Sequence, residues 1–111
     1  PQHRMVVGDW RSELYFGEAE ILIPAIGLVD GSAIRQELGA DLTYVHLLFD
    51  RHEIVCAEGA LSESFYPSVL SLTGVEAAAR AELLRLFPDL PVCAPMTARP
   101  VLRRQESSLV A

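Results

Sequence analysis

The sequence predicts a mainly β fold with one amphipathic helix towards its C-terminal end. Apolar residues gather in short runs rich in β-branched and aromatic side chains, and glycine, proline or Asp-Gly pairs separate these runs. The first run, Met5–Val7, stops at Gly8 and Asp9. The second, Glu20–Ile23, stops at Pro24. We expect both runs to be strands.

The strongest strand signals come later in the chain. Asp30 and Gly31 mark a tight turn between short extended pieces. The apolar runs Thr43–Phe49 and Ile54–Ala57 are then separated by four polar residues, Asp50–Glu53. This spacing predicts a β-hairpin with a somewhat long loop. Both faces of the first arm are largely apolar, so we expect that arm to lie deep in a sheet.

One helix is predicted. Thr73 and Glu76 have the spacing of a capping box, which favours a helix start. Residues Ala77–Phe87 are amphipathic, and Pro88 ends the pattern. We expect this helix to pack on the outside of the sheet and Arg103–Ala111 to form a terminal tail.

Composition limits the function classes. Half of the 111 residues are hydrophobic, but no apolar run approaches the roughly 18 residues that span a bilayer, so no membrane segment is predicted. Fifteen acidic residues face nine basic ones, all arginine, and the net charge of −6 argues against nucleic-acid binding. The apolar surplus favours an all-β core, an oligomer surface, or a face that packs against sequence outside this chain.

The cysteines and histidines give weak signals. Cys56 and Cys93 fit no metal or redox spacing, and two unpaired thiols are favoured over a disulfide. His3, His46 and His52 with Cys56 are acceptable zinc ligands, but no paired spacing is present, so neither a metal nor another cofactor is expected. The start of the chain lacks both an initiating Met and the apolar core of a signal peptide, which favours a piece of a longer protein.

Three segments in order resemble the motifs of the Hint domain, the self-processing module of inteins and Hedgehog C-terminal regions. Pro1–Arg4 followed by an apolar strand is similar to the end of the Ser/Thr-Pro-x-His motif. Tyr44–Phe65 resembles the C-terminal Hint motif, and is closest to the bacterial type found in large exported proteins. Pro24–Gly31 is similar to the A-x-x-L-x-x-G-D segment, with Ser32 where the family usually has Asp.

The resemblance implies a domain division. Residues 1–68 are expected to be the downstream portion of a Hint domain with a partial Hint-type β fold, and residues 69–111 a helical extension and tail. A secreted protein is implied, with a cytoplasmic one as the alternative.

The resemblance also implies a chemistry. In Hint processing, a Cys or Ser at the first position of the domain attacks the preceding carbonyl, and the peptide becomes a thioester or ester. His3 would protonate the departing amide nitrogen, a task that suits imidazole at neutral pH. Asp50 and His52 would orient or activate the nucleophile. The expected partner is therefore the chain's own upstream polypeptide, which supplies the nucleophile and the scissile bond.

The downstream end departs from the intein pattern. Inteins finish with His-Asn, whereas Glu63 and Ser64 stand at that place here. Ser64 has no side-chain amide that could cyclise to a succinimide, so splicing is not expected. N-terminal cleavage of the Hedgehog kind remains, in the intact protein only; the isolated fragment is expected to be inactive.

Other interpretations stay open. The chain could be a non-catalytic structural or binding domain that kept the Hint scaffold. A conventional hydrolase using His52 and Asp50 with Ser62 or Ser64 is disfavoured, because no Gly-x-Ser-x-Gly segment occurs. His46 is expected to be a core histidine. β edges left exposed would favour homo-oligomers.

Overall fold

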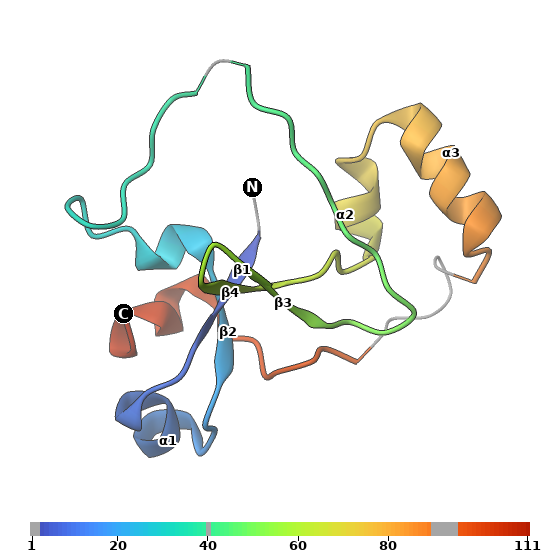
Figure 1. Cartoon of the computed structure of the whole chain (residues 1–111). Helices are drawn as coiled ribbons and strands as arrows, with labels where there is room; N and C mark the ends of the chain where they lie inside the picture. The colour runs from blue at the N-terminus through green and yellow to red at the C-terminus, as the bar shows by residue number, and fades with distance from the viewer. Residues whose placement is uncertain (1–2, 40, 90–95) are drawn as a thin grey trace.

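The computed structural model describes residues 3–39, 41–89 and 96–111. Its described part is built on an antiparallel sheet of four strands in the order β2-β1-β4-β3 (Figure 1). The strands are β1 (Arg4–Val7), β2 (Ile21–Pro24), β3 (Ile54–Ala57) and β4 (Ala60–Glu63). The predicted fold class is confirmed, since this sheet forms the core and the helices are short. The strands expected at Met5–Val7, Glu20–Ile23 and Ile54–Ala57 are present as β1, β2 and β3.

A short helix that the hydrophobic pattern does not predict connects β1 to β2. The helix α1 (Trp10–Phe16) is polar and aromatic without a clear period, so its local signal is its cap. The Asp9 side chain accepts hydrogen bonds from the backbone amides of Arg11 and Ser12. The Arg11 guanidinium lies 2.7 Å from the Asp9 carboxylate and holds the pKa of that carboxyl below its usual value. Gly17 ends the helix in the left-handed conformation.

The hairpin lies further along the chain than the sequence predicts. β3 pairs with β4, with Ala57 opposite Ala60, so Glu58 and Gly59 alone form the loop. The prediction that Thr43–Phe49 is the partner strand, deep in the sheet, is wrong: this segment forms no strand and is mostly exposed. Both loop residues have positive φ, as in a type I′ turn, whose twist matches that of the two strands. The two-residue turn therefore pairs β3 with the nearer segment.

This turn makes Gly59 sensitive to substitution in a predictable way. Its φ is +76° and a Cβ there would meet no atom within 4 Å, so Gly59→Ala adds backbone strain without a clash. We expect the free energy of unfolding to fall by about 1–2 kcal/mol in urea denaturation. Gly74→Ala is the matched control, because Gly74 has right-handed φ of −80° and should tolerate Ala without loss. Equal losses in both variants would contradict the turn assignment.

The C-terminal segment belongs to the core. Leu22 of β2 donates a backbone hydrogen bond to the Pro100 carbonyl, and Leu102 donates one back to Leu22, at 2.7 and 2.9 Å. The prediction of a terminal tail over Arg103–Ala111 is therefore wrong, because this segment continues into the 3₁₀ helix η2 (Arg104–Leu109) and a buried residue. The main apolar cluster draws its four buried residues equally from β2 and this segment: Ile21, Ile23, Leu102 and Val110.

Two helices, α2 (Val69–Thr73) and α3 (Ala77–Leu86), lie to one side of the sheet, far from α1 (Figure 1). The helix predicted after Glu76 is confirmed as α3. The predicted capping box is wrong, because Thr73 is the last residue of α2, and Glu76 makes no side-chain cap hydrogen bond to α3. Ser68 instead caps α2, accepting from the backbone amide three residues later.

The long connection between β2 and β3 arches away from the sheet (Figure 1). After the 3₁₀ helix η1 (Ala25–Leu28), its described residues contain neither helix nor strand. Asp30 organises a turn by accepting from the backbone amides of Ile34 and Ser32, and these bonds hold the pKa of its carboxyl below the usual value. The second half of the connection exposes large apolar side chains: Leu42, Tyr44, Val45, Leu47 and Phe49.

In the part of the chain that the structure describes, no helix is long and apolar enough to cross a bilayer. Cys56 is an exposed free cysteine of β3, and Cys93 lies outside the described residues.

Candidate functional site

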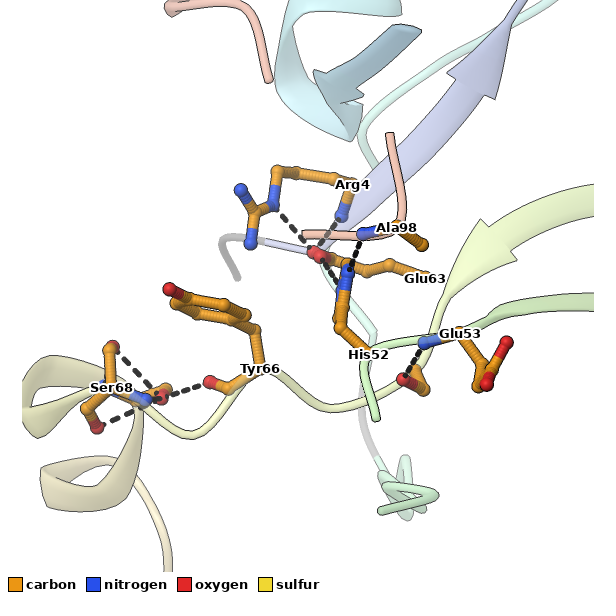
Figure 2. A network of polar contacts seen from close by, with 9 residues as sticks. Arg4, His52, Glu53, Glu63, Tyr66, Ser68 and Ala98 are labelled. Atoms are coloured by element: carbon orange, nitrogen blue, oxygen red, sulfur yellow. Dashed lines mark hydrogen bonds and ion pairs between the residues drawn. The ribbon is translucent and has the colours of Figure 1, made fainter. Parts of the chain in front are cut away.

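A buried network of polar side chains joins the start of β1, the residue pair that precedes β3 and the end of β4 to the C-terminal segment (Figure 2). Its centre is Glu63, the last residue of β4, which is 6% exposed. One carboxylate oxygen, Oε2, lies 2.9 Å from Nε2 of His52, whose side chain is fully buried. The other, Oε1, accepts two hydrogen bonds from Arg4, one from its backbone N–H and one from its side-chain Nε–H, both at 2.9 Å.

The partners of His52 fix its tautomer. Nδ1 accepts a hydrogen bond from the backbone N–H of Ala98 at 2.9 Å, so Nδ1 presents its lone pair. The ring proton of the neutral imidazole then lies on Nε2, which donates it to Glu63. Both ring nitrogens are occupied, and the ring is held on one side by the sheet and on the other by the segment that leads to Leu102. His52 is thus a fully partnered buried histidine.

Tyr66 closes the network from the side of α2 (Figure 2). The Arg4 guanidinium lies over its ring, 5.3 Å from the ring centroid, in the geometry of a cation–π contact. The ring of His52 meets the same tyrosine edge to face at 5.4 Å. The cation and the imidazole therefore both contact the Tyr66 ring.

The hairpin supplies the frame for these groups. Beyond the last paired residues of β3 and β4, Ser64 donates its backbone N–H to the Glu53 carbonyl at 2.8 Å. Its hydroxyl accepts the backbone N–H of Glu53 at 2.9 Å. The side chain thereby completes the ladder where the strands end and holds His52, one residue before Glu53, close to Glu63.

The three residues predicted to be catalytic occupy different environments. His52 is in the network. His3 is exposed and precedes β1; its carbonyl accepts the backbone N–H of Ala25 at 2.8 Å, and its side chain has no polar partner among the described residues. Asp50 is also exposed and lines a cleft of about 350 Å³ together with His52, Phe65 and Phe87. The structure thus joins His52 through Glu63 to Arg4, the residue after His3, and places Asp50 on the same cleft as His52. Among the described residues, the side chains of His3 and Asp50 make no polar contact with the network.

Sequence reasoning missed Arg4 and Glu63 as partners. A signal was present, because each is a charged residue at the end of an apolar strand, and the two have opposite charges. Continuing the β1–β4 register by one residue from the Met5–Ser62 pair places Arg4 opposite Glu63. The sequence analysis did not predict the strand β4, so it could not predict the pairing that places Arg4 opposite Glu63.

His46 does not behave as expected for a core histidine. It is exposed, and its ring packs against Phe65 with centroids 5.1 Å apart. Among the described residues, no three His, Cys, Asp or Glu side chains come together as a set of metal ligands.

Comparison with known protein families matches residues 1–69 to the Hint domain. The matched part is more than half of the chain. The chain belongs to the Hint domain family. Arg4, His52, Glu63 and Tyr66 all lie within the matched Hint residues, and Ala98 reaches the network from beyond them. No curated protein and no solved structure matches the chain significantly.

Proposed function

We propose that this Hint domain chain is part of a self-processing module that cleaves the peptide bond before its upstream nucleophile by an N–S or N–O acyl shift. One observation carries the proposal. The network links the segment of His3 to the segment of Asp50 and His52 through an ion pair between residues 59 positions apart. Two of the three segments that carry the family resemblance, Pro1–Arg4 and Tyr44–Phe65, thus meet in the folded chain.

The proposed reaction assigns a simple role to His3. A Cys thiol or Ser hydroxyl attacks the carbonyl before it, forming the S–C or O–C bond while the C–N bond breaks. The amine leaves with a proton that His3 supplies, and the nucleophile's own proton passes to a base. An exposed imidazole at the start of β1 suits this role, because a peptide can reach it. A second nucleophile then attacks the thioester or ester and releases the upstream product.

Asp50 and His52 take different parts in this proposal. Asp50 lines an open cleft, where its carboxylate is accessible to an incoming hydroxyl or thiol. His52 is enclosed and has both nitrogens occupied, so it acts by holding Glu63 in position while that geometry persists. A proton transfer at His52 would require Ala98 or Glu63 to move first.

The chain by itself is proposed to be inactive and to pair with its upstream polypeptide. Cys56 lies within β3 and cannot serve as the residue that follows the scissile bond. The exposed apolar side chains between Leu42 and Phe49 are the kind of surface that further sequence of the domain would cover. An exported parent protein remains part of the proposal through the family resemblance alone.

The test uses the full-length product of the gene that encodes this chain. We expect cleavage that a thiol or hydroxylamine accelerates, and a rate about 100-fold lower in His3→Ala, because a positioned general acid contributes about 10²–10⁴-fold. His46→Ala is the matched control, since His46 is an exposed histidine outside the network, and its rate should stay within twofold. Equal rates in the wild type and His3→Ala would remove His3 from the mechanism.

A non-catalytic scaffold is the second candidate, and the complete satisfaction of the network favours it. The buried polar groups of His52, Glu63 and Ser64 all have protein partners, as expected of a domain built for stability. If the full-length protein is not cleaved with any added nucleophile, the non-catalytic scaffold is favoured. A residue other than Cys or Ser at the start of the upstream half would favour it as well.

A further inference from the structure

We propose that Glu63 is a positioning residue that fixes the orientation of His3, and that His52 holds Glu63 in place for this purpose. The inference rests on the proposed function, in which His3 donates the proton. In this inference Glu63 and His52 act through His3, and neither of them touches the scissile bond.

The geometry begins with one peptide group, the one between His3 and Arg4. Its carbonyl oxygen, from His3, accepts the backbone N–H of Ala25 at 2.8 Å. Its N–H, from Arg4, donates to Oε1 of Glu63 at 2.9 Å. A peptide group is planar and includes the Cα atom of the preceding residue. Bonds at both ends of the group therefore fix its plane and, with it, the Cα from which the His3 side chain projects.

The two bonds come from opposite sides of β1. Ala25 follows β2, which pairs with β1 along its full length. On the other side, β4 pairs with β1 through a single residue pair, Met5 with Ser62. The Glu63 side chain thus takes the place of a further strand bond at the point where His3 leaves the sheet. Without it, the peptide group between His3 and Arg4 would be held from one side only.

Only a carboxylate meets the demand at this position. Three N–H groups converge on it: the two of Arg4 on Oε1 and that of His52 on Oε2 (Figure 2). The Ala98 N–H fixes the His52 tautomer, so the imidazole must present a donor to Glu63. His52 in turn prevents the carboxylate from rotating away from Arg4. The chain of contacts Ala98–His52–Glu63–Arg4 ends on the peptide group of His3.

A purely stabilising ion pair is the competing explanation, and a double-mutant cycle separates the two. In the full-length protein, Glu63→Gln is expected to lower the thiol-induced cleavage rate by roughly 10–100-fold, because small misplacement of a catalytic group costs about that much. In a His3→Ala background the same substitution should change the rate by less than about twofold, because the residue it positions is gone. An equal fold-loss in both backgrounds would overturn the proposal.

A second readout is independent of cleavage and uses the 111-residue chain itself. We expect Glu63→Gln to shift the NMR resonances of the His3 ring and the Arg4 amide and to speed hydrogen exchange at that amide. Glu53→Gln is the matched control: Glu53 lies on the same hairpin, and its carboxylate faces Arg51 at the surface, so these signals should not move. Unchanged His3 and Arg4 signals in Glu63→Gln would overturn the inference.

The two arms also distinguish failure of the inference from failure of the proposed function. If the full-length wild type does not cleave, the proposed function fails, and the NMR comparison still decides whether Glu63 orients His3. If Glu63→Gln does not fold, Glu63→Asp replaces it in both arms. That variant keeps the negative charge but withdraws it by one methylene, so it should weaken the Arg4 amide bond and move the same signals in the same direction. A folded Glu63→Asp variant with wild-type His3 signals would count against the proposal.

Discussion

Replacing Glu63 by glutamine is expected to lower the free energy of unfolding by about 3 kcal/mol, because removal of one partner of a buried charge pair leaves the others uncompensated. The amide offers one acceptor and one donor group, whereas the site needs acceptors on both sides. If the amide oxygen serves Arg4, its NH₂ meets the Nε2–H of His52. If the imidazole changes tautomer, its Nδ1–H meets the N–H of Ala98 instead. Every arrangement of the glutamine leaves two donors facing each other.

Urea denaturation of the wild type, Glu63→Gln and Glu53→Gln measures this effect. The Glu53 variant controls for the loss of one negative charge on the same hairpin and should stay within about 0.5 kcal/mol of the wild type, as surface substitutions do. Domains of this size have about 5–15 kcal/mol of stability, so the Glu63 variant is expected to remain mostly folded without denaturant. Losses of similar size in the two variants would show that the buried site at position 63 requires a negative charge no more than the surface site at position 53 does.

The local part of this fold was accessible from the sequence. The strands at the start of the chain and the helix α3 follow from apolar runs with clear ends, such as Met5–Val7 before Gly8 and Ala77–Leu86 before a proline. Their boundaries depend on backbone preferences within a few residues. The catalytic assignment of His3 has a different origin, because it came from the family resemblance, and it stays a prediction.

One error arose where two neighbouring segments compete for one partner strand. Thr43–Phe49 has the composition of a strand, but the tight turn at Glu58 and Gly59 gives Ile54–Ala57 a nearer partner in β4. Composition ranks segments by their preference for extended backbone, and it cannot say which pairs form. The network around Glu63 was hidden for a different reason, because it joins residues far apart in the sequence, such as His52 and Ala98, which are 46 residues apart.

The C-terminal segment shows a related limit. Arg103–Ala111 is polar and short of periodic apolar residues, which is typical of a tail. Its link to the core comes from Val110 near its end and from Leu102 immediately before the segment, which are both buried in one cluster with Ile21 and Ile23 of β2. Gly27 of η1 permits this packing, since a Cβ there would lie 2.7 Å from the hydroxyl of the buried Ser107. Close approach of this kind depends on the folded arrangement and leaves no local pattern.

The second large effect is expected in this segment. Leu102→Ala should lower the free energy of unfolding by about 3 kcal/mol, because a buried leucine loses its transfer energy and leaves a cavity. Leu102 is 6% exposed and sits in the cluster with Ile21 and Ile23, next to the backbone bond that it donates to Leu22. Leu109→Ala removes the same atoms from the same segment at a site that is 46% exposed.

The comparison of these two Leu→Ala variants by urea denaturation decides whether the C-terminal segment is part of the cooperative fold. Leu109→Ala is expected to cost no more than about 0.5–1 kcal/mol, because much of its side chain is already in water. Near-wild-type stability of Leu102→Ala would mean that the segment docks on β2 without contributing to the core. Because Ala98 lies just before this segment, a strongly destabilising Leu102→Ala would also place the partner of His52 within the stable unit. The tautomer that presents a donor to Glu63 would then be fixed by the core of the domain.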